Sequence, residues 1–130
     1  MTDRDDDWTQ NYRVPDVAVM LNQTACEARG THLFGPVDSV IEIVSPGDRT
    51  YDKLDFYSKI GVRELLVLDR DPWALKLYRH DGAALTLAAD LAPGDGRTAA
   101  GEVLPLRFQL EQAEPAPVVV AASGTKWWRI

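Results

Sequence analysis

The stretch SVIEIVSPGDRTYDK, residues 39–53, decides the fold of this chain. In its first part, β-branched apolar residues surround a single carboxylate, Glu42, which is typical of a strand buried on both faces. The letters PGD then indicate a turn, and the segment that follows has the spacing of a helix carrying Lys53. Because a helix joined to its strand by a short turn packs back near that strand, we expect the acid and the lysine to approach each other.

Outward from this stretch, the chain predicts an α+β (α/β) domain: a mixed or antiparallel β-sheet with one main helix crossing it. The helix is expected over residues 49–61, because apolar residues recur on one side at spacings of three to four and Gly61 can end it. Residues 22–36 and 92–102 are rich in turn residues and are expected to be connections. Strands are predicted at 14–21, 37–45, 63–69, 73–80 and 84–90, with weaker candidates at 103–108 and 118–122 and a closing or packing segment at 126–130.

Length and composition place the chain among ordinary globular proteins. The 130 residues predict one domain, residues 12–130, after an acidic flexible tail at residues 1–11. The net charge of −6 argues against a protein that coats nucleic acid through a basic surface, but it permits an enzyme with a local basic groove. An acidic N-terminus, no long apolar run and a single cysteine, Cys26, predict a cytoplasmic protein without a membrane partner.

Glu42 needs a reason to stand in an apolar strand. It shares a face with Val40 and Val44, where a bare carboxylate would cost several kcal/mol unless it is paired or bound to a metal. One alternative is a glutamate at an exposed strand end or in a buried salt bridge. Lys53 lies on the side of the helix that also carries apolar positions, so its ammonium can reach Glu42, although a lysine that snorkels along the helix flank fits the spacing equally well.

A second carboxylate, Asp16, opens the strand that precedes the Glu42 strand. Residues 14–21 and 37–45 are expected to be adjacent strands, so Asp16 and Glu42 can converge. Such a pair is either a site for a hard cation or a pair that shares a proton. The nearby lysine favours the metal, because Mg²⁺ or Mn²⁺ would activate a water while the ammonium stabilises charge on a phosphate. Asp38, four residues before Glu42 and on the same face, is a further candidate ligand.

Four motifs, in order and at compatible spacing, resemble the Uma-two family of restriction endonuclease-like proteins, in the PD-(D/E)xK nuclease superfamily. They are PDVAVM, DSVIEIVSPGDRTYDK, KLDFYSKIGV and RELLVLD, and they lie within residues 12–110. The lysine stands on the helix, as in this family, whereas Val44 occupies the place two residues after the glutamate. The matching positions are Asp16, Glu42, Lys53 and Tyr57, then Gly61, Val62, Glu64 and Asp69, with Ser45–Asp48 as the turn.

The resemblance implies a restriction endonuclease-like core and metal-dependent hydrolysis of phosphodiester bonds in nucleic acid, with DNA favoured over RNA. It implies that Asp16, Glu42 and Lys53 are catalytic and that Asp16 and Glu42 are ligands of Mg²⁺ or Mn²⁺, while Asp38 stays a further candidate ligand because of its place on the same strand face. Family members have a longer region before the PD strand. A shorter start predicts an open sheet edge and a homodimer or higher oligomer, and it leaves a second interpretation: a truncated, inactive member that serves as a binding or assembly module.

A few other residues attract attention but are interpreted as structural. His32 and His80 have no zinc-site spacing, and Cys26 has no CxxC partner. Trp127 and Trp128 are more typical of packing residues than of a platform on which bases stack.

Overall fold

The computed structural model describes residues 16–21, 27–28, 33–34, 37–44, 50–70 and 72–129. The acidic tail, the SPGD turn, Cys26 and His32 lie outside these residues. The elements are β1 (Val17–Val19), β2 (Glu27–Ala28), β3 (Leu33–Phe34), β4 (Ser39–Ile43), α1 (Thr50–Ile60), β5 (Glu64–Arg70), β6 (Trp73–His80), β7 (Leu85–Leu91), β8 (Ala99–Ala100), β9 (Arg107–Glu111), β10 (Val118–Ser123) and β11 (Lys126–Arg129). In the described part of the chain, no helix is long and apolar enough to cross a membrane.

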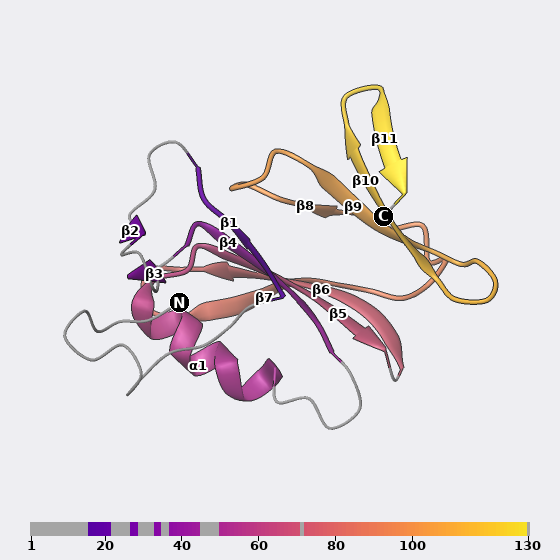
Figure 1. The fold of residues 1–130 in the computed structure, drawn as a ribbon. Helices are drawn as coiled ribbons and strands as arrows, with labels where there is room; N and C mark the ends of the chain where they lie inside the picture. The colour runs from indigo at the N-terminus through magenta and orange to yellow at the C-terminus, as the bar shows by residue number, and fades with distance from the viewer. Residues whose placement is uncertain are drawn as a thin grey trace.

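A mixed five-stranded sheet forms the centre of the fold, with strand order β1-β4-β5-β6-β7 (Figure 1). β4 and β5 run parallel, whereas the β1–β4, β5–β6 and β6–β7 pairs are antiparallel. The prediction that residues 14–21 and 37–45 form adjacent strands is confirmed, since Val17 pairs with Ile41 and Val19 with Ser39. The parallel pair is possible because α1 provides the long connection that such strands need.

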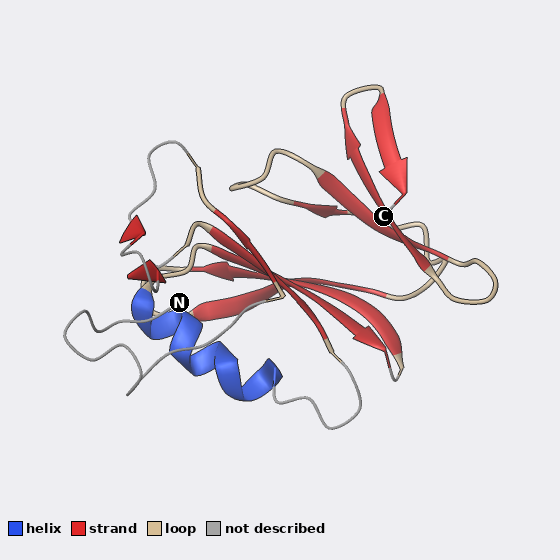
Figure 2. Ribbon diagram, in the orientation of Figure 1, coloured by secondary structure: helices blue, strands red, loops and turns tan. Residues whose placement is uncertain are grey.

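The helix α1 forms and ends as its sequence predicts. Gly61 follows it with φ 89°, a conformation that a residue without Cβ adopts freely, and Val62 N donates to the Tyr57 carbonyl at 3.0 Å. Phe56 and Tyr57 are buried in one apolar cluster with Val40 of β4 and with Leu65 and Val67 of β5. The helix therefore covers one face of the five-stranded sheet (Figure 2).

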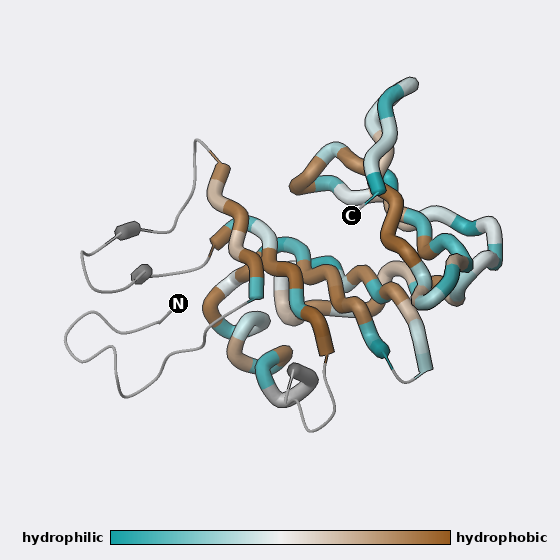
Figure 3. The backbone as a smooth tube through the Cα atoms, turned by 45° about the vertical axis from the view of Figure 1, so that its right-hand side comes forward, coloured by the Kyte–Doolittle hydropathy of each residue, from teal (hydrophilic) through white to brown (hydrophobic). Residues whose placement is uncertain are grey.

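A second sheet covers the opposite face. Its four strands have the order β11-β10-β9-β8, and Phe108, Leu110 and Ala121 pack with Leu66 and Leu75 of the central sheet. Side chains alternate along β5, so one set of its leucines and valines faces the helix and the other faces the second sheet. The apolar strands in the middle of the molecule reflect this burial on both sides (Figure 3).

Three sequence predictions are corrected by this arrangement. The segment 126–130 neither closes nor packs directly on the central sheet, because β11 is an edge strand of the second sheet. The connections predicted at 22–36 and 92–102 contain short strands, the β2–β3 pair and β8. Short pairings of two residues carry little periodicity, so propensity and pattern do not reveal them.

Candidate functional site

Glu42 lies in the middle of β4 with its side chain only 1% exposed, on the face that α1 covers. Its carboxylate meets two side chains from the helix. The Tyr57 hydroxyl donates a hydrogen bond of 2.5 Å to Oε1, and Lys53 Nζ lies 3.4 Å from the same oxygen. The other oxygen, Oε2, is buried and accepts no hydrogen bond from the part of the chain that the structure describes. One carboxylate oxygen therefore has two partners, and the other has none among the described residues.

Asp16 reaches the same point from β1. The antiparallel register that pairs Val17 with Ile41 continues to Asp16 opposite Glu42, and residues opposite each other share a face of the sheet. Asp16 Oδ2 accepts a hydrogen bond of 2.7 Å from the backbone N–H of Ile43, which holds the carboxylate beside β4. Asp16 is exposed, whereas the Glu42 side chain beside it is buried.

The electrostatics of the site follow from these contacts. Burial raises the pKa of the Glu42 carboxyl above its ordinary value of 4.5, and the Asp16 carboxyl beside it raises that pKa further. The Tyr57 hydrogen bond and the Lys53 ammonium act in the opposite direction and lower the same pKa. The effect of burial on the pKa is larger than the effect of these two contacts, so the ionised form of Glu42 is disfavoured. A further positive charge near Oε2 would stabilise this ionised form.

The donor set fits a hard divalent cation. Two carboxylates from neighbouring strands converge, and a buried oxygen of one of them has no donor among the described residues. Oxygen ligands are those that Mg²⁺ and Mn²⁺ prefer. The protein supplies few ligands, since no group of three or more His, Cys, Asp or Glu side chains able to hold a metal occurs among the described residues. A small protein ligand count is usual for Mg²⁺, which keeps several waters and binds through one or two carboxylates together with substrate phosphates.

Asp38 lies away from this point, contrary to the geometry expected from its place on the same face. Its Oδ2 accepts a hydrogen bond of 2.8 Å from Leu21 N, and Oδ1 lies 3.8 Å from Arg63 Nη1. Alternation correctly gives the face, but four residues of strand span about 13 Å, which is too far for one cation. The structure therefore brings together Asp16, Glu42 and Lys53, and it leaves Asp38 at the opposite end of β1.

Tyr57 is the site residue that periodicity alone does not single out. An apolar helix face predicts a core tyrosine, and the ring is indeed fully buried and packed edge-on to Phe56. The signal that identifies it is its position four residues after Lys53, which places both side chains on one face of the helix. Its hydroxyl satisfies Glu42 Oε1, so it fixes the orientation of the carboxylate.

Two other residues at positions that match the family motifs, Glu64 and Asp69, contact groups that stabilise the fold. Glu64 is 3% exposed, and it accepts hydrogen bonds from the backbone N–H groups of Glu102 (2.7 Å) and Val103 (3.0 Å). It thereby anchors the connection after β8 to the start of β5. Asp69 forms an ion pair of 3.6 Å with Lys76 of the neighbouring strand. His80 is likewise structural, since its Nε2 lies 3.0 Å from the Ser58 carbonyl and its Nδ1 accepts from Gly82 N.

Comparison with known proteins identifies the family to which these residues belong. No curated protein gives a significant match to the chain. The model of the Uma2 (Uma-two) family, described as "Putative restriction endonuclease", matches residues 5–113. This match covers most of the chain and includes Asp16, Glu42, Lys53 and Tyr57, and the mixed sheet with its helix is consistent with a restriction endonuclease-like fold. The chain therefore belongs to the Uma2 family of restriction endonuclease-like proteins.

Proposed function

We propose that this protein is a metal-dependent nuclease that hydrolyses phosphodiester bonds in nucleic acid, with DNA as the favoured substrate. The observation that carries the proposal is the convergence of Asp16, Glu42 and Lys53, together with a buried Glu42 Oε2 that no donor from the described part of the chain reaches. Membership in the family supports a nuclease-like activity. A purely structural ion pair between Glu42 and Lys53 would not require a second carboxylate beside it.

Asp16 and Glu42 would hold Mg²⁺ or Mn²⁺, each through a carboxylate oxygen. When bound, the ion supplies a Lewis acid for the phosphate oxygens and lowers the pKa of a coordinated water. Tyr57 holds Glu42 Oε1 in place, so Oε2 would be the oxygen offered to a cation. Asp38 is not included among the ligands, because its carboxylate is engaged by Leu21 and Arg63.

Lys53 would act on the substrate. Its side chain is 23% exposed while its ammonium reaches the buried carboxylate, so it lies between the interior of the site and solvent. From this position the ammonium can orient the attacking water and stabilise the negative charge that develops on the phosphate oxygens during the displacement. We therefore expect Lys53 to contribute to the chemical step more than to metal binding.

The test combines metal binding with cleavage. Calorimetric titration with Mn²⁺ is expected to show one site that Glu42→Gln abolishes and Lys53→Met preserves. Cleavage of labelled single-stranded and duplex DNA and RNA in Mg²⁺ should be lost in both variants. The matched control is Lys59→Met, because Lys59 lies on the same helix, 73% exposed and paired with Asp55. Metal binding that survives Glu42→Gln, or cleavage that survives Lys53→Met, would refute the assignment of roles.

The alternative function is a binding or assembly module that retains the fold without activity. The net charge of −6 favours it, since a nuclease must attract a polyanion. The same experiment separates the two functions, because an inactive module would show neither a Glu42-dependent Mn²⁺ site nor Mg²⁺-dependent cleavage.

Two further proposals concern assembly and location. We expect a homodimer or higher oligomer, and size-exclusion chromatography with light scattering would contradict this by giving a monomer at high micromolar concentration. The low cysteine content supports a cytoplasmic location.

A further inference from the structure

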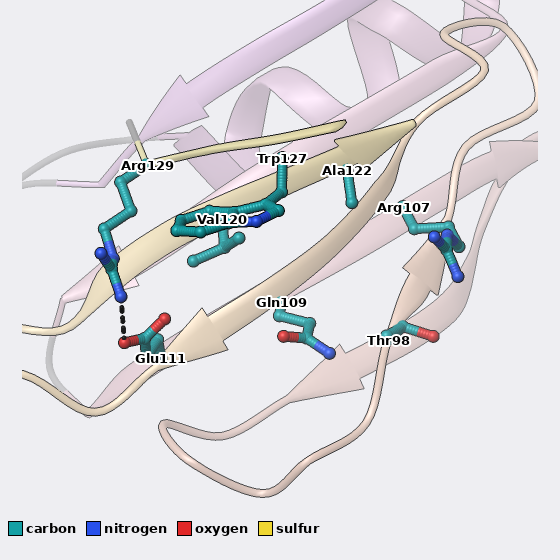
Figure 4. Close-up of a pocket in the computed structure, with 8 residues that line it drawn as sticks. All are labelled: Thr98, Arg107, Gln109, Glu111, Val120, Ala122, Trp127 and Arg129. Atoms are coloured by element: carbon teal, nitrogen blue, oxygen red, sulfur yellow. Dashed lines mark hydrogen bonds and ion pairs between the residues drawn. The ribbon is translucent and has the colours of Figure 1, made fainter. Parts of the chain in front are cut away.

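The outer face of the second sheet carries a groove that lies on the far side from the Glu42 site. The groove has a volume of about 310 Å³ and follows the central strand β10. β9, β10 and β11 each direct alternate side chains toward it (Figure 4). Its lining residues are Thr98, Arg107, Gln109, Glu111, Val120, Ala122, Trp127 and Arg129.

The groove arises from the sizes of paired side chains. Ala122 of β10 pairs with Trp127 on one side and with Arg107 on the other, and Val120 pairs with Arg129 and Gln109 in the same way. Small residues on the middle strand therefore form a floor, and long residues on the outer strands form two walls. Such a channel runs along the strand direction, and its shape suits an extended chain.

The walls are cationic, although the protein as a whole is acidic. Arg107 comes from one wall and Arg129 from the other, and Glu111 is the acidic residue that lines the groove. Arg129 pairs with Glu111 at 3.0 Å, but both side chains are about half exposed, so this ion pair is weak and open to exchange. Arg107 donates one hydrogen bond of 3.3 Å to the Gly124 carbonyl, and a guanidinium has five N–H donors.

An aromatic surface lies between these cations. The Trp127 side chain is 59% exposed, an unusual position for a large apolar ring, and Arg129 Cζ lies 5.1 Å from its centroid. Gln109 in the facing wall carries an amide that can donate to and accept from a base edge. An exposed aromatic ring beside arginines along one channel is the combination with which proteins bind unpaired nucleic acid strands.

We propose that this groove binds a single-stranded segment of nucleic acid, with a base stacked on Trp127 and the phosphates contacted by Arg107 and Arg129. The inference rests on the proposed function only for the class of ligand. Binding here requires no metal and none of the residues of the Glu42 site. The groove would hold a strand outside the cleavage site and compensate locally for the repulsion between an acidic protein and a polyanion.

The experiment measures the binding of a fluorescently labelled oligothymidylate of about 12 nucleotides by anisotropy in excess EDTA. Trp127→Ala should weaken binding about 5- to 150-fold, the range for one lost base–aromatic stack. The matched control is Trp128→Ala, because Trp128 is also exposed, at 48%, but pairs with Ala121 on the opposite face of the same sheet. This control should bind as the unaltered protein does.

Two charge variants test the electrostatic part. Arg107→Gln should weaken binding and reduce the slope of log K against log salt by about 1. Glu111→Gln should tighten binding, because it removes the carboxylate that competes with phosphate for Arg129. Circular dichroism of each variant establishes that the fold is retained.

Distinct outcomes separate failure of this inference from failure of the proposed nuclease. Equal losses in Trp127→Ala and Trp128→Ala, or unchanged binding in both, overturn the groove as a nucleic-acid site. Absence of binding together with a dimer that Trp127→Ala dissociates also overturns it and shows that this face joins two copies of the chain. If Glu42→Gln binds the oligonucleotide normally while no variant or condition gives cleavage, the groove stands and the nuclease proposal fails.

Discussion

Replacement of Tyr57 by phenylalanine should destabilise the protein in a manner that depends on pH. The ring is fully buried and is kept in the variant. The change therefore removes only the hydroxyl, which donates a hydrogen bond of 2.5 Å to Glu42 Oε1. A hydrogen bond to a charged group contributes about 1.5–3 kcal/mol, and this one has the short O–H···O⁻ distance of a charge-assisted bond. Since none of the described residues donates to Oε2, we expect a loss near the upper end of that range when Glu42 is ionised.

The pH dependence follows from the direction of the pKa shift. The pKa of Glu42 is raised in the folded protein, so the folded state binds its proton more tightly than the unfolded state does. Stability therefore falls as pH rises from about 4.5 through the folded pKa. The Tyr57 hydrogen bond lowers this pKa, so its loss in the phenylalanine variant raises the pKa further and enlarges the total fall in stability. The difference between the two proteins should be largest at pH 8 and should shrink toward pH 4.5.

Urea unfolding in metal-free buffer, followed by circular dichroism at both pH values, measures this difference. The matched control is Tyr78→Phe. Tyr78 packs against the same apolar cluster, but its hydroxyl makes no hydrogen bond within the described residues. This control should change the free energy of unfolding by less than about 0.5 kcal/mol. The reasoning is refuted if Tyr57→Phe matches the control at pH 8, or if it loses the same stability at both pH values.

Three further predictions concern single substitutions. Glu42→Gln should raise the free energy of unfolding of the metal-free protein at pH 8 by on the order of 1 kcal/mol, because it removes a buried charge. In the unaltered protein, the Mn²⁺ affinity measured by calorimetry should fall at lower pH, because protons compete for the Glu42 carboxylate. Glu64→Gln should cost about 3 kcal/mol, because the new amide would face two backbone N–H groups, and hydrogen exchange should show early opening at Glu102 and Val103. Gly101→Ala should cost about 1–3 kcal/mol in urea unfolding, because its Cβ would lie 2.5 Å from the Leu104 carbonyl oxygen, and an unchanged midpoint would contradict this packing.

The residues that the sequence identifies for the site are those whose positions follow from local rules. Alternation along β4 places Glu42 on the face opposite Ile41, and helical spacing places Lys53 and Tyr57 together. Adjacency of β1 and β4 then follows from the two apolar runs and brings Asp16 to Glu42. These inferences need only the period of each element and one pairing between strands, and such information is contained in a short stretch of chain.

The tertiary structure decided what depends on distance along an element and on contacts between distant segments. Asp38 shares a face with Glu42, but the register of β1 gives it Leu21 as a partner instead. Glu64 is also an acid at a position that matches the family motifs. Its carboxylate accepts hydrogen bonds from the backbone of Glu102 and Val103, which are distant in sequence, so its role is structural. The separate sheet of β8–β11 and its groove depend on which strands pair, and short strands of similar pattern do not specify their partners in sequence. The sequence alone determined the helix and the long strands of the central sheet, because their periodicity is local; long-range packing decided the short strands and which charged groups meet Glu42.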